Sequence, residues 1–428
     1  YDKKDIQYYN GFDNASNSNF DLNQIGAAFV FKNGNKESDW KKFTLGISYN
    51  KIEDYENGWF VQGTNPNNSI GSYFLEYANG LRLDEISAFE GESYSSAYLD
   101  IGNIYGYDNQ QAFLGYESYI LEPETNDDAN TLYSSNISGG NYNQKYYYAS
   151  NGYNGKFTVN ASTQYGDNLF LGMNLNTHFI NFERSTLIIE NNDNDESFIK
   201  EVGFENSLFT IGSGVSLQFG GIIKPIEQLR IGLTYDTPTW YYIRDETTQN
   251  ISATRDESGA LITQIINPQV LNIYPSYSLQ TPGKFTGSLA YVFGNYGLIS
   301  FDYSIKDYGN AKFKPTTDSY FLSQNNVISN KLTVASTFKI GAEYRFKQLS
   351  FRGGYRLEES PYKNGTTVSD LTGYSVGLGY SFGKLRLDLT FDEWQRESNQ
   401  ELYQVGLTDT ASIDTRNYNF SMSLSMNL

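Results

Sequence analysis

Charged side chains recur two or four residues apart within each of three segments in the last quarter of the chain, 339–345, 352–356 and 386–392. A guanidinium can hold a carboxylate through two parallel hydrogen bonds, so such a cluster on one face could bind an acidic head group. A ladder of ion pairs with a purely structural role is the alternative. The cations are Lys339, Arg345, Arg352, Arg356 and Arg386, and the carboxylates among them are Glu343, Asp388 and Asp392.

A second candidate site lies in the long polar segment 52–152, where apolar residues change to helical spacing in "SIGSYFLEYANGL" and "QQAFLGYESYIL". Two short amphipathic helices are expected there. Their apolar faces could form a groove for an acyl chain; packing of these faces on each other is the alternative. The groove residues are Ile70, Tyr73, Phe74, Tyr77, Phe113, Leu114 and Tyr116.

Motifs of covalent catalysis are not found beside these residues. No sequence resembles a nucleophile elbow, and the chain has no cysteine for a disulfide or a thiolate metal site. The 31 Lys and Arg against 49 Asp and Glu give a formal charge of -18, which argues against a nucleic-acid partner. We therefore expect no enzyme, no cofactor and no metal site.

The elements that carry the charges are predicted β-strands, because their side chains alternate strictly between apolar and polar types. The last residues, 418–428, do so without a break, as do residues 385–391. In an outer-membrane barrel the apolar face meets lipid and the polar face lines the lumen. The 37 Tyr and 28 Phe fit this setting, since tyrosine suits a membrane interface.

Short and long connections between the strands alternate along the whole chain. The short ones are 165–168, 220–228, 293–297, 346–348 and 382–384, and the long ones are 52–152, 183–206, 237–282, 307–330, 359–370 and 395–415. This alternation predicts an all-β, antiparallel, up-and-down transmembrane barrel with short periplasmic turns and long outer loops. The thirteen predicted strands are 24–33, 41–51, 153–164, 168–182, 207–219, 227–236, 283–293, 296–306, 331–346, 348–358, 371–382, 384–394 and 416–428.

An even number of strands is usual in single-chain bacterial barrels, so fourteen are expected. Since the first and last predicted strands both run toward the periplasm, one upward strand is expected before Tyr1, and residues 1–20 are expected to end an outer loop. The chain starts with neither Met nor a signal sequence, so an upstream segment is expected. Residues 1–428 then form a single barrel in which 52–152 is an outer-loop insert.

Two stretches, "PIEQLRIGLTYDTPTWY" (225–241) and "TPGKFTGSLAYVFGNYGLISFDYSIKDYGNAKF" (281–313), resemble the long-chain fatty-acid transporter (FadL-type) family of outer-membrane barrels. The resemblance extends over most of 20–428 in strand order and loop pattern. It implies a fourteen-stranded barrel that passes hydrophobic molecules from an outer groove into the barrel wall. Members of the family also have an amino-terminal plug, the hatch, with an Asn-Pro-Ala motif. This motif has no match here, since "TNPNN" at 64–68 is a loop, so any plug is expected in the upstream segment.

The resemblance and the strand pattern together predict passive uptake of hydrophobic small molecules, such as long-chain fatty acids, across the cell outer membrane. The expected partners are outer-membrane lipid and lipopolysaccharide and a hydrophobic small-molecule ligand. The alternative is a non-catalytic barrel subunit of a larger outer-membrane secretion or barrel-assembly complex. Long loops such as 237–282 would then be docking surfaces for the other subunits.

Overall fold

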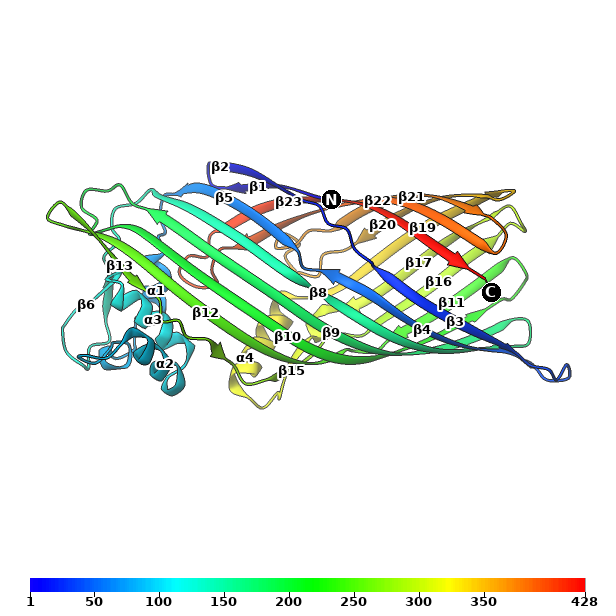
Figure 1. The fold of residues 1–428 in the computed structure, drawn as a ribbon, viewed down its shortest axis with the longest axis horizontal. Coiled ribbons are helices and arrows are strands. Elements are labelled where there is room, and N and C mark those ends of the chain that lie inside the picture. Colours follow the sequence, from blue (N-terminus) through cyan, green and yellow to red (C-terminus); the bar gives the residue numbers. More distant parts are fainter. Residues whose placement is uncertain (428) are drawn as a thin grey trace.

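The computed structural model describes residues 1–427 and is a barrel of tilted antiparallel strands (Figure 1). Tight hairpin turns gather at one end of its long axis, and long loops with helices gather at the other. We call these the short-turn end and the long-loop end. The predicted all-β architecture is confirmed. Leu428, the last residue of the predicted terminal strand, lies outside the described residues.

We use the word stave for a strand, or for several consecutive strands that lie end to end in the wall. The wall formed by residues 1–427 then has fourteen staves. In chain order these are β1 (Asp2–Tyr8); β2 (Gly11–Asn17) with β3 (Gln24–Lys32); β4 (Trp40–Asp54) with β5 (Asn57–Asn65); β8 (Tyr142–Tyr165); β9 (Leu169–Asn191); β10 (Ile199–Ile223); and β11 (Leu229–Asp236) with β12 (Trp240–Glu257). They continue with β13 (Ala260–Ile266), β14 (Asn272–Ile273), β15 (Tyr277–Gln280) and β16 (Lys284–Val292) as one stave; β17 (Gly297–Asp307) with β18 (Lys312–Lys314); β19 (Val334–Phe346); β20 (Leu349–Glu358); β21 (Leu371–Ser381); β22 (Leu385–Glu401); and β23 (Thr410–Met426).

The first twenty residues form a hairpin, so the prediction of a loop tail is wrong. β1 pairs with β2 and with the Ser412–Asn417 part of β23, and the Tyr1 amino group donates to the Tyr418 carbonyl at 2.9 Å. β1 therefore lies where the fourteenth stave was expected. β2 lies beside β5, where the Thr64 amide donates to the Asn10 side chain at 3.0 Å. Within residues 1–427, no strand pairs with the edge of β3 that faces away from β4.

All thirteen predicted strands are present, but several extend far beyond the predicted ends. β8, β9 and β10 have 24, 23 and 25 residues, whereas a tilted strand needs only about 9–11 residues to cross a bilayer. The additional residues continue the sheet beyond the spanning part at the long-loop end. As a result, the insert predicted at 52–152 is shorter, and only residues 66–141 lie between β5 and β8.

The helical cap, defined here as residues 66–141, packs on the inner faces of these extended strands (Figure 1). It contains α1 (Gly71–Ala78), the turn η1 (Leu83–Glu85), α2 (Tyr94–Ile104), α3 (Tyr107–Glu117) and the paired β6 (Leu121–Pro123) and β7 (Tyr133–Ser135). Fully buried rings such as Phe74, Phe113 and Phe204 form the core between cap and wall. The other loops carry η2 (Tyr308–Asn310) and α4 (Ser319–Lys331).

Outside the cap, the wall exposes apolar residues along its outward rows, including Leu289, Phe301, Ile340 and Leu389. In a soluble protein so large an apolar surface would be covered, and a membrane is one way to cover it. Within residues 1–427, the helices are too short and too polar for any of them to cross a membrane.

Candidate functional site

The inward-facing charges of β19, β20 and β22 form one continuous chain of ion pairs. Arg352 lies at its centre, with Nε 2.6 Å from Glu343 Oε2 and Nη1 2.7 Å from Asp388 Oδ1. Arg345 pairs with Glu343, and Arg386 pairs with Asp388 at 3.0 Å. Register explains the chain, because Glu343 and Arg352 are directly opposite each other across two strands. Three guanidinium groups thus share two carboxylates.

The other two predicted cations lie one step closer to the long-loop end. Lys339 is opposite Arg356 across β19 and β20, and Arg356 pairs with Glu358 at 3.5 Å. The structure therefore brings together Arg345, Arg352 and Arg386 and keeps Lys339 and Arg356 apart from them. Arg345, Arg352 and Arg386 thus form the ladder of ion pairs that was the alternative to a head-group site. Binding of a ligand by any of the five cations stays a prediction.

A second cationic group, to which the sequence did not point, lies closer to the long-loop end than Arg352 does. Lys284 on β16 and Lys306 on β17 are directly opposite each other, and both line a small cavity of about 70 Å³ together with Arg396 and the carboxylates of Glu358 and Glu359. Lys284 pairs with Asp236 at 3.1 Å, whereas Arg396 approaches Glu358 only at 3.9 Å. The Lys306 ammonium lies over the Tyr308 ring at 4.6 Å. Lys306 has no carboxylate within 4 Å among the described residues.

Like charges directly opposite each other on neighbouring strands destabilise a sheet. Asp236 compensates the charge of Lys284, and an anion between the two lysines would compensate that of Lys306 as well. The alternation of apolar and polar residues along each strand could have placed both lysines on inward rows from the sequence alone. Their direct opposition depends on the register of β16 against β17, which requires the "FGNYG" turn geometry as well.

The seven predicted groove residues lie in the core of the cap and not on an open surface. Tyr73 is almost fully buried and Tyr77 and Tyr116 are half-buried, whereas Ile70, Phe74, Phe113 and Leu114 are completely buried. The Phe74 ring packs edge-on against Phe204 of β10, and Tyr73 contacts Tyr403 of the β22–β23 loop. The observed contacts of these residues are packing contacts within the cap, which was the alternative to a groove. Their binding of a ligand stays a prediction.

An exposed apolar surface lies beside them, on α4. Tyr320 is 67% exposed, and Leu322 and Val327 are also exposed, while the inward face of α4 carries Phe321, which stacks on Phe313. α4 packs against the wall through Phe321, whose ring centroid lies 5.9 Å from that of Tyr277 on β15. We refer to half-buried Tyr77 on α1 and exposed Tyr320 on α4, both at the long-loop end, as the aromatic rim.

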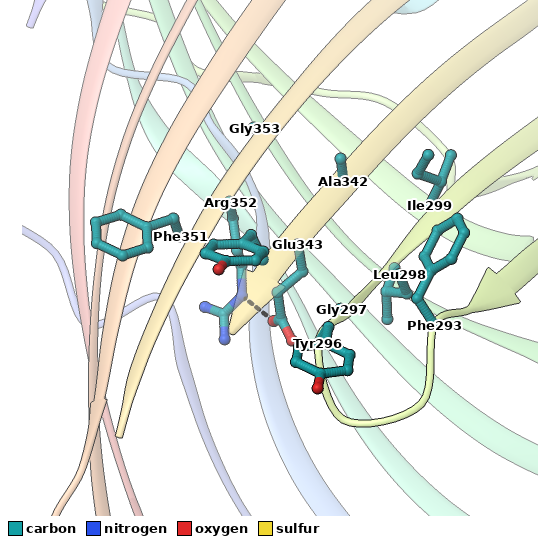
Figure 2. Close-up of a pocket in the computed structure, with 11 residues that line it drawn as sticks. Phe293, Tyr296, Gly297, Leu298, Ile299, Ala342, Glu343, Phe351, Arg352 and Gly353 are labelled. Carbon is teal, nitrogen blue, oxygen red and sulfur yellow. Dashed lines mark hydrogen bonds and ion pairs between the residues drawn. The ribbon is translucent and has the colours of Figure 1, made fainter. Parts of the chain in front are cut away.

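A separate recess of about 420 Å³ lies in the wall at the short-turn end, around the β16–β17 turn (Figure 2). Figure 2 shows Phe293, Tyr296 and Ile299 on one side and the Glu343–Arg352 ion pair on the other. Ile299, like Tyr344 and Phe351, belongs to the exposed outward rows of its strand. The recess therefore borders the ion-pair ladder from the apolar side of the wall, and we assign no ligand to it.

No protein-family model and no curated protein matches the sequence. Solved structures of low sequence identity do resemble the fold. The Ralstonia pickettii toluene transporter TbuX is 13% identical with a TM-score of 0.48, covering 100% of this chain and 88% of TbuX. A Pseudomonas aeruginosa FadL homologue is 10% identical with a TM-score of 0.45, covering 99% and 88% of the two chains. The P. putida toluene transporter TodX is 11% identical with a TM-score of 0.44, covering 100% and 89%.

Proposed function

We propose that this chain is an outer-membrane barrel of the FadL type for passive uptake of hydrophobic small molecules that carry an acidic head group, such as long-chain fatty acids. The observation that carries the head-group assignment is the direct opposition of Lys284 and Lys306 beside Arg396 in the lumen. The apolar outward rows favour a lipid environment. The short-turn end then faces the periplasm, and the cap faces outward.

The proposed path begins at the aromatic rim formed by Tyr77 and Tyr320. Tyrosine rings suit this position, since the ring body contacts an acyl chain while the hydroxyl stays in water. The path continues to the lumen cations, where Lys306 and Arg396 would hold the carboxylate. Arg345, Arg352 and Arg386 contribute less to a head-group site, because Glu343 and Asp388 already neutralise most of their charge.

Two prolines interrupt the regular strand pairing in the wall next to these cations. The pairing of Asp236 with Lys284 and of Trp240 with Gln280 places Pro238 opposite Pro282. Neither proline has an N–H to donate across the sheet. Between them, the Thr281 amide donates to the Thr239 carbonyl at 2.9 Å, and the Thr239 amide donates to the Thr281 hydroxyl at 3.0 Å. This interruption of the strand pairing beside the lumen cations supports lateral passage of an apolar chain from the lumen through the wall.

The test compares a long-chain fatty acid with the corresponding alcohol, using Lys306→Gln with Arg396→Gln. Removing a charge-assisted hydrogen bond is worth roughly 1.5–3 kcal/mol, so binding of the acid should fall about tenfold to a hundredfold. Binding of the alcohol should change little. The matched control is Arg352→Gln, which removes one lumen cation from the ladder. Equal losses for acid and alcohol in the double variant would contradict the head-group site.

One observation favours the alternative, a barrel subunit of a larger complex. Residues 258–283 contain no charged side chain in a chain with a formal charge of -18. β13 pairs only with β12, and Leu261 and Ile265 on it are more than 60% exposed. An exposed, apolar edge strand is a site at which another chain can add a strand. Co-purification of a partner that Leu261→Asp with Ile265→Asp abolishes would support this function over the first.

A further inference from the structure

Glu190 lies where the cap joins the wall. It is the last residue but one of β9, and it is directly opposite Gln144 on β8 and Val202 on β10. Only 2% of its surface is exposed. Because β9 is more than twice as long as a spanning strand needs to be, Glu190 lies beyond the spanning part, at the long-loop end.

A chain of hydrogen bonds connects the Glu190 carboxyl to three other elements. Its Oε2 accepts from the Ile70 backbone amide at 2.8 Å and from Gln144 Nε2 at 2.6 Å. Gln144 Oε1 in turn accepts from the Tyr8 hydroxyl of β1 at 2.5 Å. Ile70 directly precedes α1, and no side chain of its own caps that helix. The carboxyl of Glu190 therefore fixes the start of α1 to the wall, together with Gln144, whose Nε2 also donates to the Asn68 carbonyl at 2.9 Å.

Among residues 1–427, no Lys, Arg or His side chain pairs with the Glu190 carboxyl. The titratable groups that face Glu190 are the phenols of Tyr8 on β1, Tyr142 on β8 and Tyr403 on the β22–β23 loop. The same loop carries Asp409, which accepts from Asn68 at 3.2 Å. Glu190 Oε1 is buried and has no hydrogen-bond partner. Burial therefore raises the pKa of Glu190 to about 7, although the bonds from Gln144 and Ile70 lower it.

We propose that Glu190 is a proton-dependent latch that holds the start of α1 against β8 and β9 and so sets how firmly the cap is closed. The neutral carboxyl can be buried at little cost, whereas the ionised carboxylate is buried without a counter-charge. The folded-state pKa lies above the ordinary value of 4.5. The latch is thus fully stable below pH 4.5 and loses stability as the pH rises through about 7.

Regulation of uptake by this latch depends on the proposed function, but the latch itself can be measured without any ligand. Hydrogen–deuterium exchange of residues 66–82 would be followed in the detergent-solubilised full chain from pH 5.5 to 8.5, with correction for the intrinsic exchange rate. Opening should increase about thirtyfold over this range as Glu190 ionises. Glu190→Gln keeps the acceptor for Ile70 and should give strong protection at every pH. Glu76→Gln, an exposed change on α1 itself, should behave like the wild type.

Two results would overturn the latch: constant protection of residues 66–82 in the wild type, or an unchanged pH dependence in Glu190→Gln. If Glu190→Gln does not fold, Gln144→Leu provides the second test. The Gln144 amide stabilises the ionised form, so its loss should move the midpoint of opening to higher pH. An unchanged midpoint would also overturn the proposal. A pH-dependent latch in a barrel that takes up no fatty acid would instead contradict only the proposed function.

Discussion

At the scale of single residues, Arg352 is the side chain with most partners in the lumen. It joins Glu343 to Asp388, and only about a third of its side chain is exposed. Arg352→Gln leaves both carboxylates with fewer partners, so we expect a loss of about 1–2 kcal/mol of barrel stability. The measurement is the urea midpoint of the heat-modifiable folded band on a gel.

The matched control is Arg356→Gln on the same inward row, because Arg356 has one weaker contact with Glu358 at 3.5 Å. Its midpoint should stay closer to that of the wild type. Equal losses in the two variants would mean that the ladder does not stabilise the wall. Discrimination between fatty acid and alcohol should be unchanged in Arg352→Gln, which separates the ladder from the head-group site.

The alternation of residues along a strand predicts whether a charged side chain faces the lumen or the outside, but it does not predict its ion-pair partners. The inward side of Glu343, Arg352 and Asp388 follows from alternation alone. The neutralisation of these three groups, and the direct opposition of Lys284 and Lys306, depend on strand register. Register between two strands is set by the turn that joins them, and a single residue of slip would change every pair. For this reason the sequence places these charges in the lumen, but it does not show which of them are paired with carboxylates.

At the scale of elements, β22 offers the sharpest test of the wall. Leu389 lies on an outward row and is about half exposed, and its neighbour Thr390 lies on an inward row opposite Gly377 and Ser421. Leu389→Arg places a charge in lipid and should cost about 2–4 kcal/mol near the bilayer midplane. Thr390→Arg should be tolerated. Heat-modifiability measures both, and equal loss of the folded band would contradict the assignment of faces.

A second test concerns Gly152, where β8 passes from pairing with β4 to pairing with β5. Its φ is +110°, and a Cβ there would approach the Asn181 carbonyl oxygen to 2.1 Å. Gly152→Val should therefore cost at least about 1–3 kcal/mol. Since the strain falls above the spanning part, the cap should become sensitive to protease while the wall stays folded. A cap as resistant as that of the wild type would show that the backbone can relax there.

The thirteen strands were predictable because each has one face in an apolar setting, as in Leu385, Leu387 and Leu389 of β22. The hairpin of β1 and β2 was not predictable in this way. Lys4, Ile6 and Tyr8 of β1 point inward against the cap, and polar residues take both faces of β2, so no apolar period appears. β12 is similar, since polar residues lie on both of its faces, and Gln249 bonds to Tyr98 and Gln111 of the cap. Such strands can be recognised only in the structure, where their pairing partners are known.

At the scale of the whole molecule, the wall depends on contact between its first and last strands. Asp5 of β1 lies directly opposite Asp414 of β23, and the chain has no native cysteine. Opposed residues of antiparallel strands have Cα atoms about 4.5–5.5 Å apart, which suits a disulfide. Asp5→Cys with Asp414→Cys should form an intramolecular cross-link, visible as a mobility change on a non-reducing gel. Asp5→Cys with Ser398→Cys should not, because Ser398 lies opposite Ile413 on β22's side of β23.

The same contact between β1 and β23 fixes the order in which the protein can fold. More than 400 residues separate Lys3 from Arg416, its partner, so closing that loop costs about 5 kcal/mol of chain entropy in the unbound chain. Hairpins such as β19–β20 can form early, because their partners are near neighbours in the chain. β23 must pair with β1 across this distance. Until it does, every intermediate is an open sheet with two unpaired edge strands. Slow, late closure is therefore expected, along with a need to shield the growing sheet from self-association until the ring is complete.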